Sequence, residues 1–258
     1  PSLASITIPI NVELIDIYAF AGCTSLLSVT FNARNCDNGK TLGGHAQTLF
    51  GSSVESIVFG NEVESIPELC CYSMNKLTSV SIPTSVTKIG TGAFMYCTSL
   101  TTVDIPNSVI SIGGSAFYGC TDLTSVVIGR NVKECDYTVF MNCANIKSVV
   151  WNAINCDMPQ VAYFGTQVES FAFGDDVETI PDYCCQNMEK LTAICIPSKV
   201  KVIGKTAFLG CSGITEMDIP NSVTDIGQWS FWGCSNMTSI RIGSGVKNIG
   251  GYTFNGCS

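Results

Sequence analysis

Residues 100–122, LTTVDIPNSVISIGGSAFYGCTD, indicate the fold, because the same 23-residue phrase recurs along the whole chain with apolar residues at the same positions. Each copy begins at a Leu-like residue, and we place eleven starts at Leu3, Leu26, Val54, Leu77, Leu100, Leu123, Ile146, Val168, Leu191, Ile214 and Met237. A unit of this length cannot bury its apolar face alone and must stack on its neighbours. The sequence therefore predicts one continuous repeat solenoid of about eleven coils.

The pattern inside each phrase predicts one strand and one turn per coil. Val103 and Ile105 are apolar and the residue between them is polar, which is the period of two of a strand with one buried face. Pro106 then ends the strand, because proline lacks the donor for a ladder hydrogen bond. In SAFYGC at 115–120, the Ala, Phe and Cys would share the inner face of a short helical or 3₁₀ turn. We expect a parallel sheet on one face of the stack and these turns on the other.

A longer internal repeat lies over the 23-residue one. The segment VESIVFGNEVESIPELCCYSMNK at 54–76 agrees with VESFAFGDDVETIPDYCCQNMEK at 168–190 at 13 of 23 positions. We therefore predict that a five-coil block, 26–145, is duplicated as 146–258 within a single solenoid domain spanning 1–258. Neither end shows an evident polar cap over the sheet edge, so we also expect a segment of a longer protein.

The spaced residues L-x-x-V-x-I-P-x-x-V-x-x-I-G-x-x-A-F-x-x-C, as they stand at 77–99 and 100–122, resemble the BspA-like family of leucine-rich repeats. The resemblance covers nearly the whole chain. The departures are the Cys-Cys coils that start at 54 and 168 and the irregular coils that start at 26 and 146. The resemblance implies a leucine-rich-repeat-like, curved right-handed coil stack, an extracellular or cell-surface location, and adhesion to host proteins or other cells.

Composition narrows the classes of partner. Charged residues make up only 13% of the chain and the net charge is −8, which disfavours nucleic acid as a partner. No run of 18 apolar residues occurs, so we predict no membrane span in this segment. The insertion at 38–53 contains Gly39-Lys40-Thr41 and His45, but neither a complete phosphate-binding loop nor a nucleophile motif surrounds them. We expect an exposed loop there, which could still carry contacts.

The fifteen cysteines favour a structural interpretation. Seven of them occupy the same inward repeat position, namely Cys23, Cys97, Cys120, Cys143, Cys211, Cys234 and Cys257. Free cysteine behaves as a small hydrophobe, and the chain has one histidine and no C-x-x-C spacing, so we expect buried thiols and no metal. A few disulfides between adjacent coils stay open as an alternative. We predict no catalytic residues and no cofactor, because no acid, base and nucleophile converge.

Two surfaces are candidates for contact with a protein or glycan ligand. The first is the outward face of the sheet, at Thr102, Asp104, Ser125, Val127, Ser148 and Val150, where short hydroxyl side chains surround a mildly apolar middle. Such residues also suit any exposed sheet, so a purely structural role fits them equally well. The second is an aromatic patch formed by Trp229, Trp232 and Tyr252, which the inward position of Phe231 would leave exposed.

Two functions remain open on the sequence. The first is a non-enzymatic surface or secreted module for adhesion or protein recognition, which uses the broad surface that solenoids offer. The second is a passive structural spacer or stalk that displays another domain. A ligand lost on substitution of the sheet-face residues would favour the first.

Overall fold

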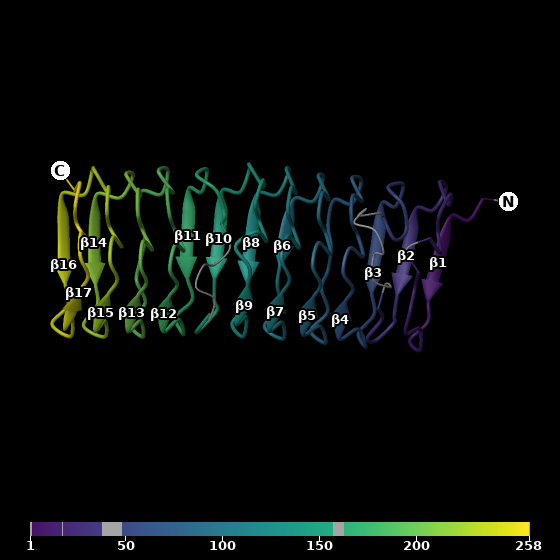
Figure 1. Cartoon of the computed structure of the whole chain (residues 1–258), viewed down its shortest axis with the longest axis horizontal. Coiled ribbons are helices and arrows are strands. Elements are labelled where there is room, and N and C mark those ends of the chain that lie inside the picture. The colour runs from purple at the N-terminus through teal and green to yellow at the C-terminus, as the bar shows by residue number, and fades with distance from the viewer. Residues whose placement is uncertain (1, 17, 38–47, 157–162, 258) are drawn as a thin grey trace.

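A computed structural model describes the whole chain except residues 1, 17, 38–47, 157–162 and 258, and shows a parallel β-solenoid whose coils stack side by side along one axis (Figure 1). The described strands of the first sheet pair in parallel, each with the strand of a neighbouring coil, with side chains alternately buried and exposed. These strands are β1 (Ser5–Ile8), β2 (Ser28–Phe31), β3 (Ser56–Phe59), β6 (Thr102–Asp104), β8 (Ser125–Ile128), β10 (Ser148–Trp151), β11 (Ser170–Phe173), β14 (Glu216–Ile219) and β16 (Ser239–Ile242). The predicted solenoid class is confirmed.

A second set of strands, which the sequence pattern did not predict, follows the first on a neighbouring face. Each is only two residues long, and each pairs in parallel with its counterpart in an adjacent coil. They are β4 (Ser65–Ile66), β5 (Lys88–Ile89), β7 (Ser111–Ile112), β9 (Glu134–Cys135), β12 (Thr179–Ile180), β13 (Val202–Ile203), β15 (Asp225–Ile226) and β17 (Asn248–Ile249). A coil can thus contribute one strand to each of two faces. On the second face the described strands form two sheets, with the orders β4-β5-β7-β9 and β12-β13-β15-β17.

The expectation of one first-face strand in every coil is wrong at two places. Residues 79–82 and 193–196 carry no strand, so the first sheet divides into β1-β2-β3, β6-β8-β10-β11 and β14-β16. Where this sheet is continuous, the residue after the strand donates its backbone N–H to a carbonyl of the previous coil. Asn32, for example, donates to the Ile8 carbonyl at 3.0 Å.

Prolines occupy this donor position around both breaks. Pro83 and Pro106 follow the first strandless segment and the strand after it, and Pro197 and Pro220 do the same in the second block. Proline has no N–H, so the ladder loses this rung on both sides of a strandless coil. The break therefore follows from two successive proline turns.

The segments expected to be helical or 3₁₀ turns form neither within the described residues. In seven turns of the described chain two residues four apart have left-handed backbone, for example Gly92 at φ 59° and Tyr96 at φ 60°. A left-handed residue breaks a right-handed helix. Alternate amides bond within the coil and across it: Cys97 donates to the Phe94 carbonyl at 3.1 Å, whereas Phe94 donates to the carbonyl of Ala116 in the next coil at 2.7 Å. The turns therefore form a third hydrogen-bonded ladder along the solenoid.

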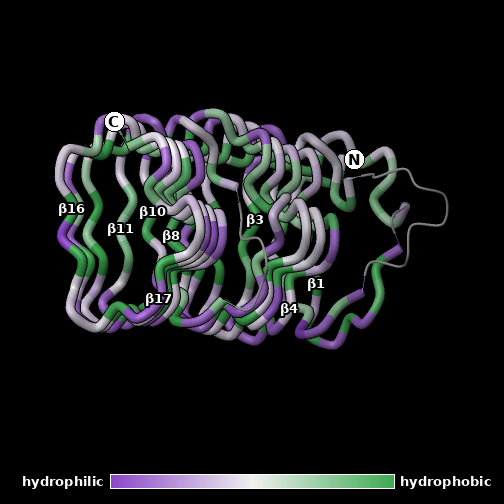
Figure 2. The backbone as a smooth tube through the Cα atoms, turned by 60° about the vertical axis from the view of Figure 1, so that its left-hand side comes forward, coloured by the Kyte–Doolittle hydropathy of each residue, from purple (hydrophilic) through white to green (hydrophobic). Residues whose placement is uncertain are grey.

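The core is a set of columns that run through the coils, and the hydrophobic bands that recur in successive coils are visible in Figure 2. Phe117 is fully buried and stacks on Phe94 at 5.1 Å and on Phe140 at 5.4 Å between ring centroids. The cysteine column lies beside it, and Cys120 donates its thiol to the Phe94 carbonyl at 3.2 Å. Cys97, Cys143, Cys211, Cys234 and Cys257 make the same contact with the residue 26 positions earlier. The thiol thus adds a polar link between coils where a methyl group would only fill space.

Candidate functional site

The six sheet-face residues singled out from the sequence lie together on three paired strands. Thr102 of β6 is opposite Ser125 of β8, which is opposite Ser148 of β10. Two residues further on, Asp104, Val127 and Val150 form a second row in the same register. Thr102 and Asp104 are exposed and the other four are half-buried. The period of two predicted this juxtaposition correctly, while a role in ligand contact stays a prediction.

A shallow groove of about 840 Å³ opens at the carboxyl ends of these strands. Its walls come from four successive coils and include Asp104 and Val127 of the predicted face. The sequence missed the rest of its lining, which comprises Val80, Ser81, Ile82, Thr84, Ile105, Pro106, Asn107, Ser108, Gly129, Asn131 and Asn152. The groove borders the strandless segment 79–82, so the two successive prolines are the sequence signal that could have located it.

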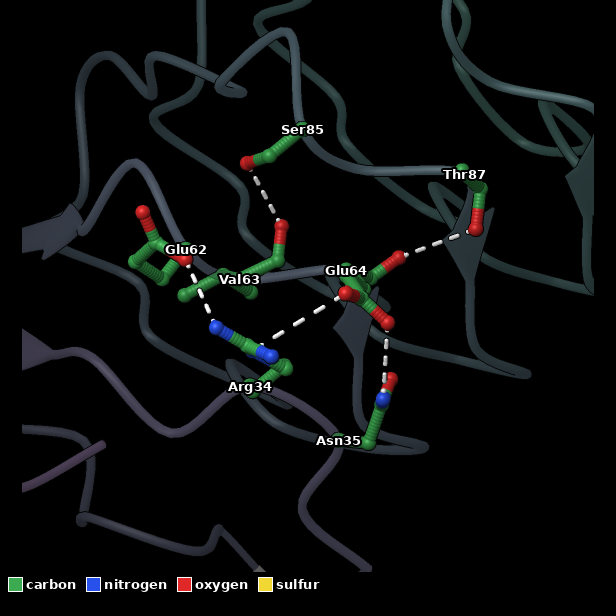
Figure 3. Close-up of polar contacts among 7 residues, drawn as sticks. All are labelled: Arg34, Asn35, Glu62, Val63, Glu64, Ser85 and Thr87. Carbon is green, nitrogen blue, oxygen red and sulfur yellow. Dashed lines mark hydrogen bonds and ion pairs between the residues drawn. The ribbon is translucent and has the colours of Figure 1, made fainter. Parts of the chain in front are cut away.

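Several charged side chains form ion pairs with a residue of another coil. The Arg34 guanidinium lies between Glu62, at 2.8 Å, and Glu64, at 3.8 Å, while Asn35 also bonds Glu64 (Figure 3). Lys199 and Asp176 are 2.6 Å apart, and this lysine is the main cause that lowers the pKa of the Asp176 carboxyl. These exposed ion pairs link neighbouring coils, and each contributes only modestly to the stability of the fold.

Asp104 differs from these carboxylates. Among the described residues that line the groove it is the only charged one, and within the described chain it has no ion pair or side-chain hydrogen bond. Its equivalent 114 residues later, Asp218 of β14, is bound by Arg241 of β16, with Nε to Oδ1 at 2.8 Å and Nη2 to Oδ2 at 3.1 Å. The same register places uncharged Val127 opposite Asp104.

The predicted aromatic patch lies on the turn side of the coils. Trp229, Trp232 and Tyr252 are 40%, 43% and 64% exposed, and the rings of Trp229 and Tyr252 stack at 6.4 Å with 18° between their planes. The prediction that these rings point away from the core is therefore correct. A second aromatic row joins Tyr72, Tyr96 and Tyr118 edge to face at 5.9 and 5.5 Å.

The repeat architecture has a direct counterpart among known families. A family model described as the BspA type leucine rich repeat region matches in six copies over residues 2–41, 45–163 and 156–258. The chain belongs to this family. The family assignment made from the repeat phrase is thereby confirmed, and the two Cys-Cys coils lie within the matched ranges.

Solved structures are similar to this BspA-type protein at low sequence identity. A leucine-rich repeat protein from Eubacterium ventriosum is 14% identical over 99% of this chain and 83% of that chain, with a TM-score of 0.52. One from Bacteroides ovatus is 20% identical over 98% and 84%, with a TM-score of 0.43. A leucine rich cell surface protein from Faecalibacterium prausnitzii is 24% identical over 99% and 77%, with a TM-score of 0.41. No curated protein matches the chain.

The cysteines of this BspA-type protein are free thiols, and most are buried. Burial raises the pKa of the Cys97 thiol to about 12 and that of Cys234 to about 12, so both are neutral at physiological pH. Cys195 is exposed on the sheet face, at the second strandless segment. Within the part of the chain that the structure describes, no group of three His, Cys, Asp or Glu side chains could hold a metal ion.

The 38–53 insertion, the remaining candidate for ligand contact, lies mostly outside the described residues. His45 and Gly39-Lys40-Thr41 belong to 38–47, so the expected contacts of the 38–53 insertion stay a prediction. Among the described residues no helix has the length and apolar character needed to cross a membrane.

Proposed function

We propose that this BspA-type protein is a non-enzymatic recognition module, secreted or held at a cell surface, that binds a protein or glycan through the face formed by β6, β8 and β10. The observation that carries the proposal is the groove at the strand ends, where one carboxylate without an ion pair among the described residues stands over apolar side chains, beside three strands that pair in one register. A rigid, register-aligned face of this kind holds its side chains at fixed spacing, so little ordering entropy is lost on binding.

The family supports a repeat scaffold whose surface, not its core, carries specificity. The Faecalibacterium structure is described as a cell surface protein, which supports the proposed location for this chain. The low charge content of the face favours contacts by hydrogen bonding and apolar burial over long-range attraction. Adhesion to another cell or to a matrix protein would use such a surface.

The test is a binding screen of the full chain against matrix proteins, a glycan array and whole cells. The face variant carries Ser148→Lys and Val150→Lys on β10, which change the face and leave the groove lining intact. The matched control is Thr30→Lys on β2, a half-buried position of the same row in the first part of the sheet.

We expect a ligand whose affinity falls with the face variant and not with the control. Retained affinity in the face variant would contradict the assignment of the site and direct attention to Trp229, Trp232 and Tyr252. A screen without any ligand would contradict recognition and support the passive spacer.

A further inference from the structure

An aspartate occupies the same repeat position in both halves of the chain. Within the described residues it has no ion pair in the first half and is paired with an arginine in the second. Asp104 on β6 and Asp218 on β14 are 114 residues apart, and each is opposite the residue 23 positions later. That residue is Val127 in the first half and Arg241 in the second. A smaller groove of about 410 Å³, lined in part by Arg241, lies at the equivalent strand end. The second half therefore serves as an internal reference for the first.

Arg241 shows how a guanidinium fits this position. Its Nε and one Nη contact the two separate oxygens of Asp218, which is the two-point geometry that arginine makes with a carboxylate. Lysine presents a point charge and cannot form this fork. Arg241 reaches Asp218 from the neighbouring strand, whereas Val127 occupies that position beside Asp104, whose two carboxylate oxygens have no such partner among the described residues.

The chain's own nearby cations are already engaged. Arg130, in the coil of β8, contacts Asp176 at 3.2 Å, and Lys147 contacts Glu169 at 3.7 Å. Val80, Ile105 and Val127 give the groove apolar walls that suit the aliphatic stem of a long side chain. At the rim, Asn107 Oδ1 accepts a hydrogen bond from the Arg130 N–H at 2.9 Å and Asn131 Nδ2 donates one to the Asn107 carbonyl at 2.8 Å, so these amides hold the rim in place. The net charge of −8 also favours a cationic partner.

We propose that the groove beside Asp104 receives an arginine side chain of a partner protein, with its guanidinium on the Asp104 carboxylate and its stem against Val127. Arg241 fills the equivalent position in the second half from within, so that half is closed to the same partner. This inference rests on the proposed recognition function and names the chemistry of its ligand. A partner that covers the groove excludes water and so strengthens the ion pair.

The test is a titration of the full chain with N-acetyl-arginine amide. Binding is monitored through the backbone N–H chemical shifts of the protein in two-dimensional NMR spectra. The matched probe is N-acetyl-citrulline amide, which has nearly the same shape and no charge. We expect shifts centred on Asp104 and Val127 with the arginine probe and none with the citrulline probe. Asp104→Asn should weaken binding about tenfold, since it removes a hydrogen-bonded charge partner.

Two reciprocal variants sharpen the result. Val127→Arg recreates the internal pair and should abolish binding at Asp104. Arg241→Val removes the internal guanidinium and should create a second set of shifts around Asp218. Equal shifts with the citrulline probe, or unchanged binding in Asp104→Asn, would overturn the inference. The binding screen separates the two proposals. If either of those results were obtained while the variant with Ser148→Lys and Val150→Lys still lost affinity for a ligand found in the screen, the recognition function would stand and the arginine assignment alone would fail.

Discussion

Truncation of Phe117 to alanine tests whether stability is carried by the stacked columns of the core. Phe117 is fully buried and has a parallel ring on each side, at 5.1 and 5.4 Å. Truncation of a buried phenylalanine costs about 3–5 kcal/mol, and the two lost ring contacts place Phe117→Ala at the upper end of that range. Native proteins have a free energy of unfolding of about 5–15 kcal/mol, so the expected loss is a large fraction of the total stability.

The matched control is Phe254→Ala in the last described coil. Phe254 is half-buried and its one ring neighbour within the described residues is Phe231 at 5.6 Å, so the expected loss is about 1–2 kcal/mol. Urea unfolding followed by far-ultraviolet circular dichroism measures both losses from the transition midpoints. Equal losses for the two variants would refute the idea that each ring is stabilised by the coils on both sides.

Three further predictions follow from the proline breaks, the turns and the thiols. Pro83→Asn restores a donor beside 79–82 and should slow amide exchange in that segment; unchanged exchange would contradict the proline explanation. Gly119→Ala should cost about 1–2 kcal/mol, because φ is 70° there, whereas Gly114→Ala should stay within about 0.5 kcal/mol; equal urea midpoints would argue against the left-handed turn. The folded pKa of Cys97, about 12, exceeds the ordinary value of 9.0, so the folded state holds this proton more tightly. Stability should therefore fall as pH rises above about 9, and Cys97→Ala should reduce the slope of urea midpoint against pH.

The solenoid itself could be predicted from sequence because its signal is repeated. The apolar column represented by Val103 recurs in every coil, and the structure places Val103 opposite Val126 and Val126 opposite Val149. The second sheet could not be predicted in this way, since a strand of two residues such as Ser111–Ile112 is too short to show a period. The left-handed turns were missed because a bulky residue such as Tyr96 gives no hint of a positive φ.

The site was predicted in part. The period of two was sufficient to bring Thr102, Ser125 and Ser148 into one row. The groove was missed because its walls come from four coils and its position depends on a break in pairing between coils, which no single phrase contains. The contrast between Asp104 and Asp218 could have been found, because Val127 and Arg241 stand one coil later in the same column of the sequence.

The groove beside Asp104 is tested most sharply by comparing Asp104→Asn with Asp218→Asn for binding of a protein ligand returned by the screen. The two substitutions remove the same charge from equivalent strand positions, but Asp218 already holds Arg241. We predict that Asp104→Asn weakens the affinity for this ligand about tenfold, while Asp218→Asn leaves the affinity unchanged. Equal effects of the two substitutions, or a loss confined to Asp218→Asn, would contradict this prediction.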